Sequence, residues 1–510
     1  MSDKEPSELS IGIRFKRREG GHGARYPRTL EELYDVSLPE DLVEKGIGWL
    51  RRQGFRVTGR TKSTVSLRAP RKLFNTTFGA KVVCKKVKQE GGGGWWWLCE
   101  PADGVLDIPA ELKDIVAAVE LQQNSSYLSS DAAVTSDRPA VLRRGAPTRN
   151  ARVRATPPAL DPATLRPAEV DPEPLDVLVD VPRLLNARSV HVDDGRTGAG
   201  VQVAMIDSGF DHRHPFFTKH GFRSEVALAN DANQSSTFTD PEGHGTGQSA
   251  NLFVVAPGIT FFGVKMWDDG LAAPDATLAE GFQKAVEMLG GFALQGGGAA
   301  PPPRVISCSV MDVSSDVLAE VINDAYLSGI TIVACAGNGQ FAFPGQMRQV
   351  ISAGGVRVAK GSGAARASNF ASAFVTVDDL GQERSVPDCC GLVGELPRAA
   401  YIMLPVEKGS VRDASCAAFD GTRSDDGWAL FSGTSSATPQ IAGICALLLE
   451  VNPLLTPDEI KAILAQSSRN VTTGSTRVAT GGFKATRNKV DVATGHGLVD
   501  ASAAVRIASA

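Results

Sequence analysis

No stretch of the sequence approaches the roughly 18 consecutive apolar residues that a membrane span requires. The first residues, MSDKEPSELSIGIRFKRREGG, also lack the apolar stretch of a signal peptide. These absences argue against an integral membrane protein. We therefore expect no membrane partner and a cytoplasmic location.

Excess charge of one sign is also lacking, because the formal net charge is only -4. The single compact basic run, Arg14 to Arg18, is short and is followed at once by Glu19. Such a balance provides no extended positive field for holding nucleic acid. We predict no nucleic-acid partner.

The eight cysteines form no CxxC pair, which argues against a zinc site. Cys308, Cys335 and Cys445 lie in apolar runs, where a buried thiol packs well. We therefore expect reduced cysteines, no metal and no cofactor. Calcium stays open for one polar segment with irregularly spaced acids, although a solvated loop is the usual explanation of such a segment. These acids are Asp413, Asp420, Asp425 and Asp426.

The length of 510 residues exceeds one ordinary hydrophobic core, so we predict several segments. They are an N-terminal tail at 1–27, a small α+β domain at 28–121, a flexible linker at 122–179 and an α/β domain at 180–510. Residues 1–120 hold 21 Lys and Arg against 17 Asp and Glu, a net charge of +4, which leaves -8 for the remainder. The two parts should attract each other modestly.

Periodicity supports the small domain. DLVEKGIGWLRRQG has helical spacing, FRVTGRTKSTVSLRAP alternates like a hairpin, and a second helix is expected after Pro70. GGGGWWW, at residues 91–97, reads as a loop tip whose rings pack onto nearby surface, or as a segment that docks into a partner or a cleft. The Ser-, Pro-, Ala- and Arg-rich linker has too few large apolar residues to build a core.

Short apolar runs alternate with helical segments in the remainder, which is the pattern of a parallel sheet covered by helices. Helices are expected near 274–289 and 314–328, and two more in SSATPQIAGICALLLEV and TPDEIKAILAQSS. The expected strands are VQVAMI, TFFGVKM, RVISCSV, ITIVACA and QVISAGG.

Chemically useful side chains stand where these elements begin or end. Asp207 follows the strand VQVAMI, at the carboxyl end where parallel sheets present functional groups. His244 lies in Glu-Gly-His-Gly-Thr before the apolar helix SANLFVVA, where we expect the imidazole to face open space. His212 and His214 are expected to shape the loop after Asp207. Taken singly, a strand-end Asp or a capping His is unremarkable.

Two further motifs could stabilise negative charge. Ser435 lies in Ser-Gly-Thr-Ser-Ser-Ala-Thr-Pro at a predicted helix start, where free N–H groups point toward the hydroxyl. Asn338 lies in Ala-Gly-Asn-Gly after the strand ITIVAC, so its amide could donate a hydrogen bond to an oxyanion. A helix cap and an Asn turn are the ordinary explanations of each motif alone.

Together, DSG, GHGT, AGN and GTSSATP occur in one order, and residues 180–510 resemble the subtilisin-like serine peptidases (subtilases, peptidase family S8). The phrases VAPG and GHGLVD and the pair Pro387-Asp388 extend the likeness. The resemblance implies a three-layer domain with a mainly parallel sheet flanked by helices. It also implies a serine endopeptidase that uses Asp207, His244 and Ser435 as a triad and Asn338 in the oxyanion hole.

The resemblance further implies a protein or peptide substrate and a cleft lined by Ser309 to Met311, including Val310, and by Ala336 and Gly337. Two departures put the pocket shape in doubt. Gly247 replaces the second histidine often found after GHGT, and Met311 replaces a common glycine.

The N-terminal domain resembles the propeptides of subtilisin-like and sedolisin peptidases, in the helix DLVEKGIGWLRRQGFRV and in LFNTTFGAKV. This likeness implies a self-inhibited zymogen in which the domain is the chain's own partner. The linker, with Arg138, Arg143 and Arg144, then offers cleavage sites. A protein partner that triggers activation would suit a proenzyme retained in the cell.

Two alternatives differ in chemistry. Sedolisins share the serine motif but use a Glu/Asp/Ser arrangement and lack GHGT, which this chain has. A catalytically silent, peptide-binding scaffold of the same fold would keep the sheet without needing all four chemical positions. Labelling with a serine-reactive probe separates a scaffold from an enzyme.

Overall fold

The computed structural model describes residues 6–17, 37–88, 95–102, 104, 106–122, 174–228, 238–266, 276–287, 303–312, 315–378 and 381–510. Most of the predicted linker and the glycines of GGGGWWW lie outside these residues. Within the described residues, no helix is both long and apolar enough to cross a membrane.

The N-terminal domain is an antiparallel sheet, in the order β2-β3-β1-β6, whose core is shared with the helices α2 and α3. Its helix α2 buries Val43, Ile47 and Leu50, and it ends at Gly54, whose φ of 105° suits glycine. The predicted hairpin is confirmed as β2 and β3. The elements are β1 (Glu8–Phe15), α2 (Glu40–Gln53), β2 (Arg56–Arg60), β3 (Thr64–Pro70), α3 (Arg71–Thr77), β4 (Val82–Lys88), β5 (Trp95–Pro101), η1 (Ala110–Leu112) and β6 (Val116–Gln122).

The predicted tail contains an integral strand. β1 lies between β3 and β6, so the domain begins well before residue 28. Four alternate residues of β1 are buried in the core between the sheet and α2: Leu9, Ile11, Ile13 and Phe15.

The expectation that all cysteines are reduced is wrong at one place. Cys84 and Cys99 face each other across the antiparallel strands β4 and β5 and form a disulfide. The other six cysteines are free thiols and buried. Disulfides are typical of oxidising compartments, so this bond weighs against the cytoplasmic location, which stays a prediction.

The α/β domain is built on an eight-stranded sheet in the order β14-β13-β12-β11-β8-β10-β9, with β17 also paired to β13. All pairings but that of β13 with β14 are parallel, and the five predicted strands are confirmed as β8, β10, β11, β12 and β13. The strands are β8 (Gln202–Asp207), β9 (Arg223–Leu228), β10 (Thr260–Lys265), β11 (Val305–Cys308), β12 (Thr331–Cys335), β13 (Val350–Val358), β14 (Ala365–Ala367) and β17 (Cys389–Leu392).

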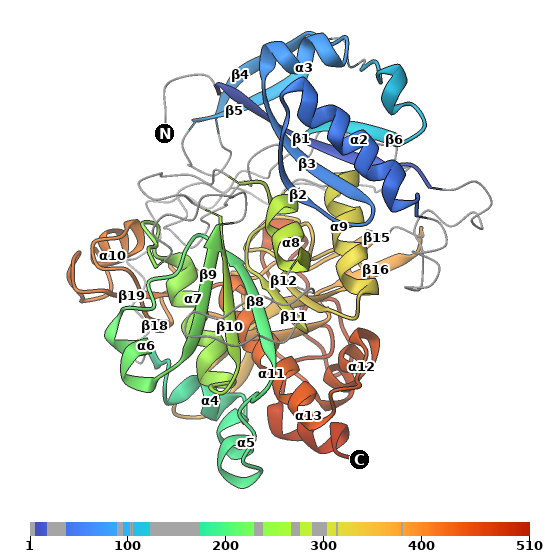
Figure 1. The fold of residues 1–510 in the computed structure, drawn as a ribbon. Coiled ribbons are helices and arrows are strands. Elements are labelled where there is room, and N and C mark those ends of the chain that lie inside the picture. The colour runs from blue at the N-terminus through green and yellow to red at the C-terminus, as the bar shows by residue number, and fades with distance from the viewer. Residues whose placement is uncertain are drawn as a thin grey trace.

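Helices cover both faces of this sheet (Figure 1). Along β8, Val203 and Met205 join the core that contains α7 and α11, whereas Ala204 and Ile206 join the core that contains α8 and α9. The alternation gives the predicted three layers. The helices are α4 (Asp180–Leu184), α5 (Ala187–Asp193), α6 (Pro215–His220), α7 (His244–Val255), α8 (Leu278–Glu287), α9 (Asp316–Leu327), α10 (Val411–Cys416), α11 (Thr434–Val451), α12 (Pro457–Ser467), η4 (Val478–Thr480) and α13 (Ala501–Ala508).

Small sheets complete the domain. One has the order β19-β18-β7, and another is the hairpin of β15 and β16. Helix α12 begins with the capping box of Thr456 and Glu459 that its sequence predicts. The remaining strands are β7 (Leu175–Asp176), β15 (Phe374–Val377), β16 (Glu383–Val386), β18 (Ile402–Pro405) and β19 (Trp428–Phe431).

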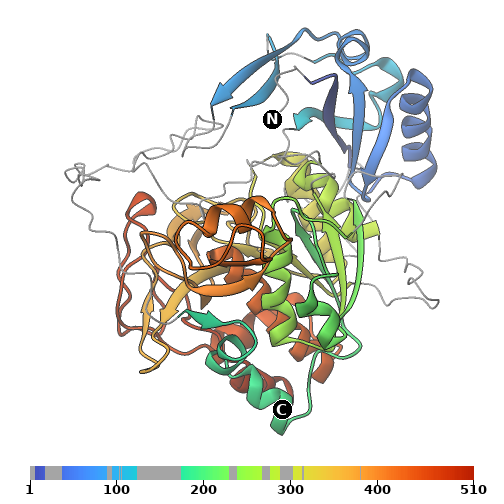
Figure 2. The same cartoon turned by 90° about the vertical axis from the view of Figure 1, so that its left-hand side faces the viewer.

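The N-terminal sheet lies over α8 and α9, as Figures 1 and 2 show from two directions. Arg68 on β3 forms an ion pair of 2.8 Å with the fully buried Glu280 on α8. Arg17 pairs at 2.8 Å with Glu320 on α9. The basic side of this interface therefore belongs to the N-terminal domain and the acidic side to the helices, as the charge count predicts.

Candidate active site

Asp207 is the last residue of β8 and is fully buried. Its Oδ1 accepts hydrogen bonds from the backbone N–H of Ser208 at 2.7 Å and from Nδ1 of His244 at 2.8 Å. A carboxylate that accepts a bond from Nδ1 places the imidazole proton on that nitrogen. The other ring nitrogen, Nε2, is then left with a lone pair.

His244 is the first residue of α7 and follows Gly243, whose φ is 92°. Gly245 lies tightly against the loop after Asp207, because a Cβ there would be 2.2 Å from the carbonyl oxygen of Gly209. The imidazole is buried, with 1% of His244 exposed, so the expectation that it faces open space is wrong. Its Nε2 lies 3.3 Å from Nε2 of Gln248, one helical turn further on.

A buried carboxyl that the sequence did not single out joins the two loops. Asp240 accepts a 2.7 Å hydrogen bond from the hydroxyl of Ser208, and that hydroxyl accepts one from the N–H of Gly245 at 2.9 Å. Its other oxygen accepts from the N–H and hydroxyl of Thr246. Burial, assisted by the charge of Glu242, raises the pKa of Asp240 to about 7.

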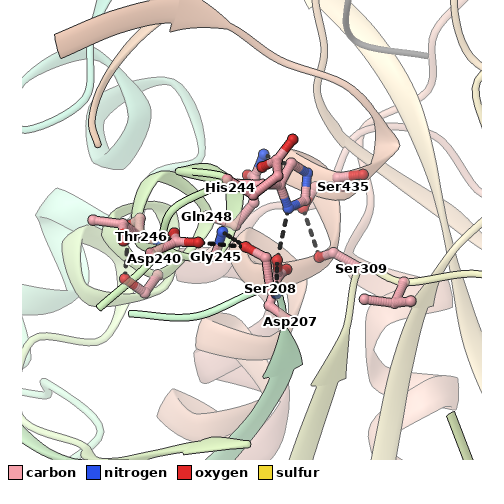
Figure 3. Close-up of polar contacts among 12 residues, drawn as sticks. Asp207, Ser208, Asp240, His244, Gly245, Thr246, Gln248, Ser309 and Ser435 are labelled. Atoms are coloured by element: carbon pink, nitrogen blue, oxygen red, sulfur yellow. Dashed lines mark hydrogen bonds and ion pairs between the residues drawn. The ribbon is translucent and has the colours of Figure 1, made fainter. Parts of the chain in front are cut away.

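Ser435 is the second residue of α11, a helix that is buried through most of its length. The N-cap residue Gly433 has an extended backbone, and the carbonyl of Ser435 accepts a 2.9 Å hydrogen bond from the hydroxyl of Ser309. Figure 3 shows Ser435 beside the imidazole of His244, with Asp207 below the ring. A serine hydroxyl here lies near the free N–H groups of a helix start.

Asn338 follows β12 and is oriented by the same helix start. Its side-chain oxygen accepts hydrogen bonds from the N–H of Thr434 at 2.9 Å and from the Thr434 hydroxyl at 3.0 Å. The amide NH2 is therefore the end directed away from Thr434. Gly337 has φ of 105° and donates its N–H to the same hydroxyl, so the turn is pinned to α11.

Residues 198–497 match the model described as "Subtilase family". The chain belongs to the subtilase family. The three-layer fold with its mostly parallel sheet is the one that the sequence resemblance predicts, and it is confirmed. The match begins after the linker, so the likeness of the N-terminal domain to propeptides stays a prediction.

Individual relatives of this subtilase are distant. Serine protease AprX of Bacillus subtilis (strain 168) is 27% identical over 296 residues, which cover 52% of this chain and 61% of AprX. Subtilisin of Bacillus pumilus is 24% identical over 294 residues, which cover 54% of this chain and 86% of that protein. The structure "Crystal Structure of a Lanthipeptide Protease" matches with a TM-score of 0.46 and 20% identity, over 65% of this chain and 95% of that one.

Two neighbouring parallel strands are followed by the residues that we predict to line the substrate cleft. Ser309 to Met311 follow β11, whereas Ala336 and Gly337 follow β12, so the structure brings both segments to one end of the sheet. All five are buried, and Met311 packs in a small cluster with Cys335 and Ala342. Their contact with substrate stays a prediction.

The glycine at position 247, where the second histidine is often found, has a structural reason in this subtilase. A Cβ there would lie 2.7 Å from Cζ of Phe431, so the ring of Phe431 occupies the space that a side chain would need. The centroid of the Phe431 ring lies 6.2 Å from that of the His244 ring, and the guanidinium carbon of Arg412 lies 5.2 Å from the same Phe431 centroid. An aromatic ring therefore covers one side of the imidazole.

The acidic segment considered for calcium lies beside the site. The N–H groups of Val411 and Arg412 in α10 bond to the carbonyls of Pro241 and Glu242, just before His244. Several of its carboxylates accept loop N–H groups, including those of Gly409 and Gly427 at Asp413. Among the residues that the structure describes, no group of three or more His, Cys, Asp or Glu is arranged to hold a metal ion.

The other two histidines near Asp207 have structural partners. His212 is buried against the ring of Phe217 and bonds to the hydroxyl of Ser249 at 2.9 Å, and burial lowers its pKa to about 3. His214 caps α6 by accepting a hydrogen bond from the N–H of Phe216. Both shape the loop after Asp207, as predicted.

Proposed function

We propose that this subtilase is a serine endopeptidase whose triad is Asp207, His244 and Ser435. The observation that carries the proposal is the buried 2.8 Å hydrogen bond from His244 Nδ1 to Asp207, next to a helix start that bears Ser435. This bond leaves Nε2 as the basic atom of the ring. Membership of a family that includes serine protease AprX supports the same chemistry.

In the proposed reaction, the Ser435 hydroxyl attacks the peptide carbonyl and transfers its proton to Nε2 of His244. Asp207 stabilises the resulting imidazolium. The oxyanion accepts hydrogen bonds from the Asn338 amide and the Ser435 N–H, and His244 then protonates the leaving amine. Water, deprotonated by the same imidazole, hydrolyses the acyl-enzyme and regenerates Ser435.

We also propose that the N-terminal domain keeps the enzyme in a zymogen form. Support comes from its ion pairs with Glu280 and Glu320, which hold it against the helices on one face of the catalytic sheet. Cleavage in the segment 123–173 would break the covalent link between the two domains. The N-terminal domain would still be held by this interface until it dissociates. The substrates are proteins or peptides, including the chain itself.

The test is labelling of the purified full chain with a fluorophosphonate probe, followed by a gel that reveals shortening. Ser435→Ala should abolish both labelling and self-shortening. Ser436→Ala is the matched control, because Ser436 is the adjacent serine of the same helix and is fully buried. It should retain both.

Each outcome has a distinct meaning. Shortening with labelling confined to the shortened form supports a latent zymogen. Equal labelling of the wild type and Ser435→Ala would assign the reactive nucleophile elsewhere and reject the triad. Absence of labelling at all pH values, even after proteolytic removal of the N-terminal domain, would favour the scaffold alternative.

A further inference from the structure

A row of buried amide side chains leads from the imidazole of His244 to the neighbouring helix α11. Gln248 and Asn251 follow His244 at one-turn spacing on α7, and Gln440 lies on α11. All three amides are fully buried. The row ends at the backbone N–H of Leu392 on β17.

The direction of every hydrogen bond in this row is fixed from its far end. The N–H of Leu392 can only donate, so it is Oε1 of Gln440 that accepts, at 2.7 Å. Gln440 Nε2 then donates to Asn251 Oδ1 at 3.0 Å, and Asn251 Nδ2 donates to Gln248 Oε1 at 3.2 Å. The atom of Gln248 left facing the imidazole is its NH2 nitrogen, 3.3 Å from Nε2 of His244.

An amide NH2 only donates, so the imidazole nitrogen opposite it must accept. The carboxylate of Asp207 only accepts, so Nδ1 on the other side of the ring must donate. Both neighbours therefore select the same neutral tautomer. Protonation of Nε2 would bring two donors face to face in a buried site, where such a mismatch is costly.

We propose that Gln248 is a positioning residue, oriented by Asn251 and Gln440, which holds His244 as the neutral Nδ1–H tautomer and disfavours the imidazolium. The inference deepens the proposed function and rests on it for its consequence. A neutral His244 is the form that can take the proton of Ser435, once the serine hydroxyl replaces the Gln248 NH2 at the single lone pair of Nε2. The row should therefore keep His244 neutral, and able to act as the base, at lower pH.

Two glycines make room for this arrangement. A Cβ at Gly391 would lie 2.8 Å from Oε1 of Gln440, so only glycine leaves the terminal bond undisturbed. Gly247, beside Gln248, yields its space to Phe431, which covers the ring of His244. The amide of Gln248 therefore approaches the imidazole in a site where the ring of Phe431 fills the neighbouring space.

The charged and titratable groups around the imidazole come from several elements and stay unchanged in the variants below. Asp240 must be separated from the ring experimentally, because burial raises its pKa to about 7, into the window where histidine titrates. Direct NMR observation of the His244 ring nitrogens separates the titration of His244 from that of Asp240. The groups are Asp207 on β8, Asp240 and Glu242 before α7, Arg412 on α10, and the buried thiol of Cys308 on β11.

The test is a pH titration of ¹⁵N-histidine NMR signals in the full chain carrying Ser435→Ala, with His244→Gln to assign the signal. Gln248→Leu removes the donor and should raise the midpoint of the His244 titration by about 0.5–1 pH unit, the worth of one hydrogen bond. Gln248→Glu replaces the donor by an acceptor and should raise it further. The resting tautomer should show a protonated Nδ1.

Gln440→Glu tests the row from its far end. Gln440 lies 189 residues from Asn251 in the sequence. The substitution keeps an acceptor for Leu392 but loses the donor to Asn251, so the midpoint should rise in the same direction by a smaller amount. This variant also serves if Gln248→Leu does not fold. Identical midpoints in the folded variants, or the reverse order, would overturn the proposal.

The activity profile separates this inference from the proposed function. In an active wild type, the acid limb of the fluorophosphonate labelling rate should shift upward with Gln248→Leu by the same amount as the NMR midpoint. A wild type that never labels but shows the predicted order of midpoints rejects the peptidase and keeps the amide row. An enzyme that labels, but whose NMR midpoints do not change in the variants, keeps the peptidase and rejects the amide row.

Discussion

Asn338 shows how one side chain after a strand obtains a fixed direction from a helix that lies far along the sequence. Thr434 supplies two donors to its amide oxygen, so the NH2 end is the one directed away from Thr434, as the proposed oxyanion role requires. Asn338→Ala should therefore lower kcat about 10²- to 10³-fold, as for such donors in this class of enzyme, and change KM little. Steady-state hydrolysis of a peptide substrate measures both.

Thr434→Val is the informative companion, because it removes one of the two donors and leaves the amide in place. Its loss in kcat should be smaller than that of Asn338→Ala. Equal kcat values for the wild type and Asn338→Ala would remove Asn338 from the oxyanion hole.

Gly247 offers a stability prediction. Gly247→Ala should destabilise the protein by about 1–3 kcal/mol, because the new Cβ would overlap the ring of Phe431. Gly361→Ala is the control, since a Cβ there meets nothing within 4 Å, and it should stay within about 0.5 kcal/mol. Urea unfolding in the Ser435→Ala background measures both without self-digestion. A neutral Gly247→Ala would mean that Phe431 can move away from His244.

The sequence could predict which residues meet in this site, because each motif stands at a strand end or helix start of a parallel sheet. It could not predict Asp240, which stands in a polar stretch and acquires its role only when Ser208 and Thr246 fold around it. The burial of His244 was also missed, because it depends on Phe431, which is distant in sequence.

At the scale of elements, apolar runs predicted the central strands well because a parallel sheet is buried on both faces. β1 was assigned to the tail, although the alternation of Leu9, Ile11 and Ile13 was a usable signal. The disulfide had no such signal. Only the pairing register of β4 and β5 brings Cys84 opposite Cys99.

The contact of β3 with α8 gives a prediction at this scale. Arg68→Ala should destabilise the N-terminal domain by about 3 kcal/mol, because it leaves the fully buried Glu280 without its cation. Bonds from Thr58 and the Thr277 N–H to Glu280 remain, which places the loss at the lower end of the usual range. The free energy of unfolding by urea in the Ser435→Ala background is the measurement.

Lys85→Ala is the control within the same domain. Lys85 and Glu100 form a pair that is more than half exposed, so its loss should cost less than about 1 kcal/mol. Similar effects of the two substitutions would contradict a buried ionic contact at Glu280.

For the whole molecule, the interface between the domains should depend on pH. Burial raises the pKa of Glu320 to about 7 and that of Asp324 to about 6, although Arg17 and Ser63 respectively oppose the shift. Raised carboxyl pKa values stabilise the docked state at low pH, and this contribution is lost as the pH rises through about 6–7. Release of the N-terminal domain should therefore become easier above pH 7.

Glu280 sets the opposite limit. Burial acts to raise its pKa, but the guanidinium of Arg68 outweighs this and leaves the pKa below the usual value, so its contribution is lost as the pH falls below the ordinary range of glutamate. Docking should be strongest between these limits. The measurement is hydrogen exchange of α8 and α9 in the Ser435→Ala chain at pH 4, 5.5 and 8, corrected for intrinsic exchange rates. Glu320→Gln should reduce the loss of protection in these helices at pH 8.

The position of α11 near the end of the fold has a consequence for biosynthesis. A chain leaves the ribosome from its N-terminus, so β1–β6, α8 and α9 are all synthesised before Ser435. The domain that lies on α8 and α9 can therefore form before Ser435, the proposed nucleophile, has been synthesised. The proposed triad therefore cannot assemble on the growing polypeptide until α11 has been synthesised.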